Sequence, residues 1–404
     1  MSDRRHAVSS IPVPVERLGE RALRIERMAG VVGVLGLLLC VAGFFVDRTV
    51  FFQSYLFGFT YWAGFAIGGL GVLLMHHTVG GRWGVTIRRL LEAQMRTLPL
   101  VGILLLPVLL LGLQQVYPWA RPEELAMEAV LRHKQGYLNI PFFVGRTILY
   151  FAVWLFWGFR VNRMADRQDE TGDPTLRERM RAFSAPGVLV FTLTASFAYI
   201  DWILSADVQF FSTVYGAMIL IGDVLQGIAM SIIVLVFASG KDGFQGRVNS
   251  KVLHDLGNMM FAFVIFWAYL SASQLIIVWP ANLPQELQWY LVRVHGFWKY
   301  FAAATALSMF ALPFCLLLSQ ERKRNPIRLV RVAIFILCAR VIDMFWIVEP
   351  TYRRGGFAIY WTDFAAFIGI GGVWIYAYLR QLRRRPLLPL QDARIAPPVS
   401  EAAA

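Results

Sequence analysis

Long apolar segments alternate with short polar segments along the whole chain. A run of roughly 20 apolar residues is long enough to cross a bilayer as a helix. The polar connections reach about 25 residues, which is too short for a separate globular domain. The pattern predicts an all-α polytopic membrane protein with ten transmembrane helices. The apolar runs lie at about 29–46, 53–75, 98–116, 142–161, 186–204, 212–238, 257–279, 296–318, 327–348 and 360–380.

This pattern also predicts the domain organisation. We expect a cytoplasmic N-terminal tail over 1–28, a ten-helix membrane domain over 29–380 and a disordered, Pro/Ala-rich C-terminal tail over 381–404. Within the membrane domain, spans two to five (about 53–204) and six to nine (about 212–348) are expected to form two four-helix bundles. The first and the tenth span then flank the bundles.

The composition and the distribution of charge agree with a membrane protein. The chain is 57% hydrophobic and 16% charged, against about 25% charged residues in soluble domains. When residues at the span ends are counted with the adjoining loops, 29 of its 39 Lys and Arg residues fall on the side of the predicted termini and 8 on the other side, while Arg146 and Arg340 lie inside spans. Positive charge concentrates on the cytoplasmic side of membrane proteins. Both termini are therefore predicted to be cytoplasmic, and the net charge of +13 does not indicate nucleic-acid binding.

Several classes of redox and hydrolytic site have no support in the sequence. The three cysteines, Cys40, Cys315 and Cys338, lie in apolar runs without C-x-x-C spacing, whereas an iron–sulfur cluster usually needs four thiolates. No C-x-x-C-H haem motif, phosphate-binding loop, G-x-S-x-G or H-E-x-x-H is present. No histidine falls at mid-depth in a span, so neither a transmembrane haem nor a metal site is predicted.

The adjacent His76 and His77 end the second span, just before Gly80 and Gly81. We expect a helix end at the cytoplasmic interface, with the imidazole tips among lipid headgroups. Proton entry or lipid binding is the alternative.

Ionisable groups inside the membrane are costly, so each is a candidate functional residue. Asp223 falls near the middle of the sixth span, where desolvation favours a neutral carboxyl group. Arg340 and Asp343 are three residues apart in the ninth span and are expected to pair with each other. Structural contacts within the bundles are the alternative. The complete set of proton-pathway candidates is Asp223, Arg340, Asp343, Arg146, Ser271 and Gln274, with His76, His254 and Asp255 at the cytoplasmic end.

The aromatic stretch "WPANLPQELQWYLVRVHGFWKY" (279–300) is predicted to connect two spans on the non-cytoplasmic side. Trp and Tyr are enriched at membrane interfaces. The stretch can therefore be an interfacial belt or a docking surface for an extramembrane partner.

Two long segments resemble a known family. "FFQSYLFGFTYWAGFAIGGLGVLLMHHTVGGRWGVTIRRLLEA" (51–93) and "HDLGNMMFAFVIFWAYLSASQLIIVWPANLPQELQWYL" (254–291), together with ten spans, are similar to the NrfD-like membrane subunits of bacterial respiratory complexes. The resemblance is greatest to the second NrfD-like subunit of alternative complex III. It covers nearly the whole chain apart from the tails.

The resemblance implies an integral subunit of a quinol:cytochrome c oxidoreductase in the bacterial cytoplasmic (inner) membrane. Its partners would be another NrfD-like subunit, a periplasmic iron–sulfur subunit, multihaem cytochrome subunits, membrane lipids and, in some assemblies, a terminal oxidase. Haem and iron–sulfur clusters would lie in the partners, and menaquinone or ubiquinone would be the quinone. The chain itself would bind no redox centre, would not be catalytic alone, and would supply a proton pathway or a quinone contact. A secondary transporter and a purely structural anchor are the alternatives.

Overall fold

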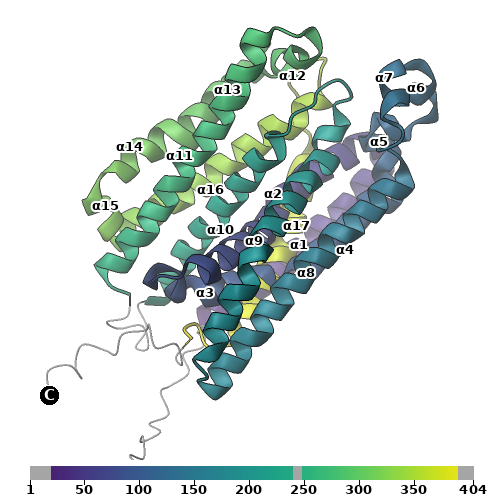
Figure 1. Cartoon of the computed structure of the whole chain (residues 1–404). Coiled ribbons are helices and arrows are strands. Elements are labelled where there is room, and N and C mark those ends of the chain that lie inside the picture. The colour runs from purple at the N-terminus through teal and green to yellow at the C-terminus, as the bar shows by residue number, and fades with distance from the viewer. Residues whose placement is uncertain (1–19, 240–247, 390–404) are drawn as a thin grey trace, which may run out of the picture.

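The computed structural model describes residues 20–239 and 248–389, and within these ranges the chain is helical and contains no strand. Long helices run side by side to form one elongated bundle (Figure 1). Nine helices of the described residues are long and apolar enough to cross a membrane. The protein is therefore an all-α, multi-pass membrane protein, as the apolar pattern predicts.

The remaining predicted span, the ninth, corresponds to a helix in which charged residues recur along the whole length. This helix, α16 (Pro326–Val348), has 23 residues and contains Arg331, Arg340 and Asp343. At 1.5 Å per residue it is about 35 Å long, which is enough to cross the bilayer beside the others. Every 18-residue stretch of this helix contains at least three charged residues, which sets it apart from the other nine.

The remaining spans follow the predicted order. The first five are α1 (Glu20–Val46), α2 (Arg48–Val79), α4 (Leu98–Pro107) continued by η1 (Val108–Gly112) and α5 (Leu113–Val116), α8 (Ile140–Thr171) and α9 (Thr175–Trp202). The others are α10 (Tyr215–Ser239), α11 (Ser250–Ala281), α13 (Trp298–Thr305) continued by η5 (Ala306–Ala311) and α14 (Leu312–Leu318), α16, and α17 (Trp361–Arg383). Shorter helices in the connections are α3 (Arg82–Met95), η2 (Pro118–Ala120), α6 (Pro122–Met127), α7 (Ala129–Lys134), η3 (Leu204–Ala206), α12 (Pro284–Val294), α15 (Gln320–Arg324) and η6 (Glu349–Thr351).

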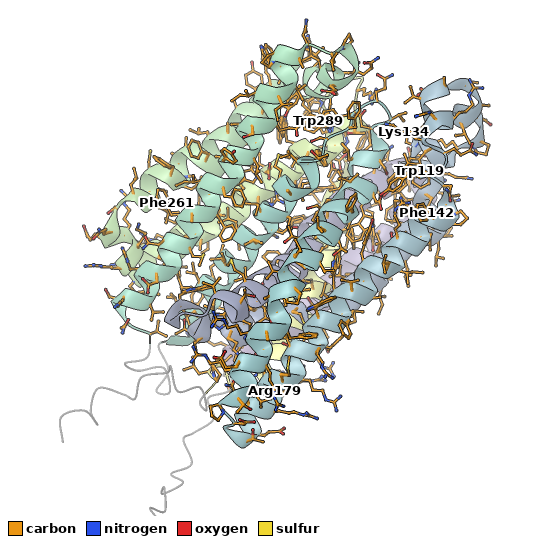
Figure 2. All side chains as sticks on the ribbon, in the orientation of Figure 1. Trp119, Lys134, Phe142, Arg179, Phe261 and Trp289 are labelled. Atoms are coloured by element: carbon orange, nitrogen blue, oxygen red, sulfur yellow. The ribbon has the colours of Figure 1, made fainter. Side chains whose placement is uncertain are left out.

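Two faces of the bundle can be named from the chain ends. The start of α1 and the end of α17 lie at the same face, where Arg383 pairs with Glu26 at 2.6 Å; we call it the terminal face. The opposite face contains α6, α7 and α12 (Figure 1). Figure 2 shows Trp119 and Trp289 towards the opposite face and Arg179 at the terminal face.

The helices α2 and α10 form the centre of the molecule and pack against each other. Around α2 lie α4, α8 and α9, and around α10 lie α11, α14 and α16, so that the contacts close two groups of four helices. Glycine permits the close central approach, because a Cβ at Gly68 of α2 would overlap the backbone of Asp223 in α10. Both central helices are largely hidden from lipid, so polar residues on them are shielded by protein.

Several helices extend beyond the predicted spans. The helix α1 begins at Glu20 within the predicted tail 1–28, and α8 continues ten residues past the predicted end at 161. Apolar runs mark the membrane-embedded part of a helix, whereas polar residues continue the same hydrogen-bonding pattern outside it.

The predicted tails lie largely outside the described residues, which begin at 20 and end at 389. The prediction of disorder from residue 381 is wrong for the part that is described. The helix α17 continues to Arg383, Leu387 and Leu388 are buried, and Arg385 pairs with Asp166 of α8. Burial of the two leucines and this ion pair hold the segment against the bundle.

The first and last transmembrane helices, α1 and α17, pack through glycine. A Cβ at Gly36 would lie 2.5 Å from the Cα of Gly369, and a Cβ at Gly33 would lie 2.5 Å from the backbone nitrogen of Val373. Small residues that allow such close contact are a usual basis of helix association in membranes. The contact surface on α1 therefore requires glycine at these two positions.

We predict that Gly36→Ala lowers the stability of the protein, because the added methyl group forces α1 and α17 apart. Overpacking of this kind costs about 1–3 kcal/mol. The matched control is Gly30→Ala on the same helix, where the new Cβ would meet the ring of Tyr376 at 3.2 Å and a side chain can yield. Thermal unfolding in mild detergent should show a lower midpoint for Gly36→Ala only. Equal midpoints for the two variants would contradict the glycine contact.

Candidate functional site

A buried arginine between two aspartates lies at the interface of α10 and α16. Arg340 Nη2 donates to Asp223 Oδ1 at 3.0 Å, and Nη1 donates to Asp343 Oδ2. Nη2 also donates to the backbone carbonyl of Ile219 at 3.0 Å. Arg340 is 1% exposed and both aspartates are 0% exposed. The three side chains form one buried ionic cluster, in which two potential negative charges face one positive charge.

The predicted pairing of Arg340 with Asp343 is confirmed. The sequence did not predict that Asp223, 117 residues away in the chain, contacts the same guanidinium. At 1.5 Å per residue, Asp223 lies about 12 Å from the start of α10 at Tyr215 and about 24 Å from its end. The cluster is therefore nearer the opposite face than the predicted mid-depth position, because α10 begins at residue 215 rather than 212.

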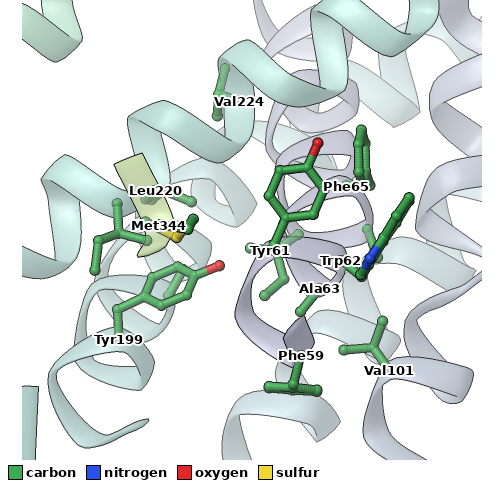
Figure 3. Close-up of a cluster of buried hydrophobic side chains, with 14 of the residues drawn as sticks. Phe59, Tyr61, Trp62, Ala63, Phe65, Val101, Tyr199, Leu220, Val224 and Met344 are labelled. Carbon is green, nitrogen blue, oxygen red and sulfur yellow. The ribbon is translucent and has the colours of Figure 1, made fainter. Parts of the chain in front are cut away.

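Tyr199 of α9 extends the cluster towards the first group of helices. Its hydroxyl donates to Asp223 Oδ2 in a short hydrogen bond, and the side chain is fully buried. Figure 3 shows the Tyr199 ring among the labelled apolar side chains of Leu220 and Met344. The phenol thus links α9 to α10 in an apolar environment. The sequence could not predict this contact, because it depends on α9 and α10 being neighbours.

Two glycines make room for the cluster. A Cβ at Gly222 would overlap the guanidinium of Arg340, and a Cβ at Gly64 of α2 would lie 2.6 Å from Asp223 Oδ1. Asp223 therefore binds the guanidinium of Arg340, and the absence of a side chain at the preceding Gly222 leaves room for it.

A cavity of about 330 Å³ adjoins the cluster in the second group of helices. It is enclosed by α10, α11, α12, α13, η5 and α16, and Asp343 forms part of its wall. Ser271 Oγ and Thr305 Oγ1 line it and have no hydrogen-bond partner among the described residues, whereas Trp267 in the same wall interacts with the Asp343 carboxyl group. Its other walls are mainly apolar and aromatic. The cavity brings Ser271, a predicted candidate, next to Asp343.

Buried polar side chains continue from Asp223 towards the terminal face. Gln226 donates to the carbonyl of Tyr61 at 2.9 Å, and Gln94 of α3 donates to Ser231 Oγ at 3.1 Å. Gln226, Gln94 and Ser231 are all 0% exposed. The sequence did not predict Gln94, because α3 was expected to be a connection outside the bundle. It did not predict a role for Ser231 of α10 either, because its contact with Gln94 depends on where α3 packs.

The helix α3 also changes the environment of the paired histidines. Its residues Ile87 and Leu91 are fully buried, and it packs against α2 and α10. His76 is 0% exposed, and its ring lies 5.6 Å from that of Trp83 of α3. His77 is 8% exposed. The prediction of exposed imidazole tips is wrong, since both rings are buried and α3 folds back over the end of α2, where Trp83 and Gly84 lie against the His76 ring.

Arg146 forms a second buried ion pair in the first group of helices. Its Nε and Nη2 donate to both carboxylate oxygens of Asp201 in α9, at 2.8 and 2.9 Å. Tyr150 donates to the same carboxylate at 2.7 Å. A cavity of about 340 Å³ adjoins Asp201 near the opposite face. The structure thus places Arg146 in a cluster separate from that of Arg340.

The remaining candidates lie apart from Asp223. His254 and Asp255 begin α11, where Asn258 contacts His254 at 3.3 Å and accepts a hydrogen bond from Lys323 of α15 at 2.7 Å. Gln274 accepts a hydrogen bond from Ser212. Among the described residues, no hydrogen bond or ion pair joins His254 or Asp255 to Asp223. The structure therefore does not bring the predicted cytoplasmic end of the pathway together with Asp223.

The comparisons with known proteins give no assignment: no protein-family model matches the chain, and no curated protein matches it.

The arrangement of Tyr199, Asp223, Arg340 and Asp343 can hold and transfer protons. A carboxyl group and a phenol joined by a hydrogen bond are able to exchange a proton, and a guanidinium stabilises whichever carboxylate is ionised. The cluster connects three helices and ends at a cavity. It can therefore move a proton over several ångströms inside protein that excludes lipid.

We predict that Arg340→Gln lowers the yield of folded protein strongly, because it leaves two buried carboxylates without their cation. Breaking a buried pair in this way costs about 3–5 kcal/mol. Adding Asp343→Asn to Arg340→Gln should restore part of the yield, since one stranded charge is removed. Arg331→Gln, at an exposed position of α16, is the control and should be neutral. If the double variant is as poor as the sum of the two single variants, measured by size-exclusion chromatography, the residues are not coupled.

Proposed function

We propose that the chain is an integral membrane subunit of a bacterial quinol-oxidising respiratory complex and that it provides a pathway for protons. The observation that carries the proposal is the buried chain Tyr199–Asp223–Arg340–Asp343, which joins the two groups of helices and ends at a cavity. The subunit carries no redox centre, and electrons pass through haem and iron–sulfur subunits on the periplasmic side. Menaquinone or ubiquinone is the quinone of the complex.

The resemblance of residues 51–93 and 254–291 to NrfD-like subunits supports this assignment. Both segments contribute to the region around the site. The first includes α2, the central helix that contacts α10, and the second includes Trp267 and Ser271 of the cavity wall. The excess of Lys and Arg near the terminal face supports a cytoplasmic location for that face, in the bacterial inner membrane.

The proton pathway follows from the chemistry of the cluster. A proton that arrives from the terminal side passes the polar side chains of Gln94, Ser231 and Gln226 before it reaches Asp223. Arg340 then lets the negative charge move between Asp223 and Asp343 without leaving an isolated carboxylate in the bundle. The cavity beside Asp343 continues the route towards the opposite face.

A secondary transporter is the main rival. Transporters of this kind bind their substrates near the midplane, between discontinuous helices. In this protein η1 and η5 are π-helical segments inside otherwise continuous helices, and the cavity beside Asp343 has mainly apolar walls. These features favour the proton pathway over the transport of a polar solute. A purely structural anchor is the second rival, and the following experiment separates it from a proton-conducting subunit.

We predict that Asp223→Asn abolishes proton translocation coupled to quinol oxidation while the oxidation itself continues. Asn keeps the size of the side chain and can accept a hydrogen bond, but it cannot carry a proton. The measurement is the number of protons translocated per electron by the complete complex in proteoliposomes. Glu170→Gln is the control, because Glu170 is exposed near the end of α8 and should have no effect.

An unchanged ratio of protons to electrons in Asp223→Asn would remove Asp223 from the pathway. Loss of quinol oxidation together with translocation would instead favour the structural role, because the variant would then have disturbed the whole complex.

We further predict that the protein purifies with haem-containing and iron–sulfur subunits. The opposite face contains the aromatic helix α12, with Leu283, Leu291 and Val294 exposed, and such a surface suits an extramembrane partner. A tagged chain extracted from membranes with a mild detergent should bring down proteins with haem absorbance. Purification of a stable, single polypeptide would contradict membership of a complex.

A further inference from the structure

A second buried acid lies at the opposite face, where the turn after α16 meets α17. Glu349 is the first residue of η6 and is 0% exposed. It follows the predicted span 327–348 directly, so the sequence did not identify it as an acid inside the membrane. Glutamate is almost never fully buried unless it is paired, so its partners decide its charge.

Glu349 shares its cationic partner with another acid. Arg353 Nη2 lies 2.8 Å from Glu349 Oε2 and 2.6 Å from Asp363 Oδ1. Within the described residues, no other cationic group is within salt-bridge distance of either acid. Two carboxylates thus face one guanidinium in a site that excludes water, and full ionisation of both would leave an uncompensated buried charge.

The hydrogen bonds distinguish the two acids. Asp363 accepts four: two from Arg353, one from Ser54 Oγ at 2.5 Å and one from the backbone nitrogen of Tyr360 at 2.8 Å. Glu349 has only the 2.8 Å contact between its Oε2 and Arg353 Nη2, and neither of its oxygens accepts a hydrogen bond from any other described residue. Hydrogen bonds stabilise the ionised form of a carboxyl group. Asp363 is therefore the ionised partner of Arg353, and Glu349 is the acid that holds a proton.

The other neighbours of Glu349 do not supply the missing positive charge. Arg293 of α12 is directed to the carbonyl of Ile347 and to Thr351, both at 2.7 Å. Tyr352 follows in the chain and interacts with Glu349 electrostatically. Burial, together with the charge of Asp363, outweighs Arg353 and raises the pKa of Glu349 to about 8. A group with this pKa binds and releases protons in the physiological range.

A polar pocket lies directly beside this site. It has a volume of about 380 Å³ and is lined by Thr351, Tyr352 and Arg354, which follow Glu349 in the chain, and by Asp207, Glu124 and Glu128. Glu128 is exposed, so the pocket is on the surface of the opposite face. Thr351, at the end of the η6 turn that Glu349 begins, belongs to the pocket wall.

We propose that Glu349 is the proton-release group of this subunit: it holds a proton inside the protein and delivers it to water in the adjacent polar pocket. In this step the O–H bond of the carboxylic acid breaks, the proton passes to water, and the carboxylate that remains pairs with Arg353. This proposal deepens the proposed function, on which the direction of proton flow rests. The protonation state of Glu349 can be tested independently of that function.

The first test is an infrared titration of the purified full-length protein. The C=O band of a buried, protonated carboxyl group should disappear as the pH is raised through about 8, and this change should be absent in Glu349→Gln. Glu286→Gln, a partly exposed acid of α12, is the control and should retain it. A spectrum of Glu349→Gln identical to that of the wild type would overturn the proposal, and so would a band that does not titrate.

The second test compares two conservative variants at the same arginine. Gln mimics a protonated Glu, so Glu349→Gln should not lower the thermal midpoint at neutral pH, whereas Asp363→Asn should lower it. Raising the pKa of a carboxyl group on folding gives stability that is complete below its unfolded pKa and is lost as the pH rises to about 8. The wild type should therefore lose stability relative to Glu349→Gln over this range. A fall in Glu349→Gln as large as in Asp363→Asn would identify Glu349 as an ionised structural partner instead.

The third test assigns the role in release. In proteoliposomes of the complete complex, Glu349→Gln should keep quinol oxidation and lower the number of protons released per electron. An unchanged ratio would overturn the release role. Failure of the Asp223→Asn experiment alone would remove the proposed pathway but leave the titration of Glu349 intact, so the two failures are distinguishable.

Discussion

A single guanidinium inside the bundle sets the arrangement of the surrounding helices. Arg340 can remain charged away from water only because Asp223, Asp343 and the carbonyl of Ile219 surround it. These partners come from two helices, so α10 and α16 must keep one relative position along their axes. Gly222 and Gly64 are needed to leave space around the cluster. A mainly apolar interface between helices would tolerate sliding, whereas this one has a fixed register.

The same constraint connects the two groups of four helices. Asp223 accepts hydrogen bonds from Arg340 of the second group and from Tyr199 of the first. Its helix, α10, packs on α2 at the centre of the molecule. A change in the charge of Asp223 would therefore be felt by helices of both groups. In the first group, Arg146, Asp201 and Tyr150 form a cluster of similar composition. In both clusters a buried arginine of the membrane domain pairs with an aspartate of a neighbouring helix: Arg340 with Asp223 and Arg146 with Asp201.

The sequence was sufficient for the number, order and approximate limits of the membrane helices, because apolar length determines which segments cross a bilayer. It also predicted the pair Arg340–Asp343, since residues three apart share a helical face. It could not predict that Asp223 joins Arg340 or that Asp201 joins Arg146, because these contacts depend on which helices are neighbours. The helix α3 was missed for a different reason: its buried residues recur at helical spacing within a charged segment, and a search for long apolar runs passes over it. His76 was consequently placed in the headgroup layer instead of beneath Trp83.

The pairing of α1 with α17 bears on how the protein is made. Gly33 and Gly36 of α1 fit against the backbone of α17 near Gly369 and Val373, and α1 has only a smaller contact with α2. The helix α1 therefore completes its packing only after α17, which is synthesised much later in the chain, has entered the membrane. Until then its glycine surface faces lipid or the insertion machinery. The contact between α1 and α17 can form only in a chain that contains all the helices between them. A chain truncated before α17 would leave the glycine surface of α1 exposed to quality-control proteases.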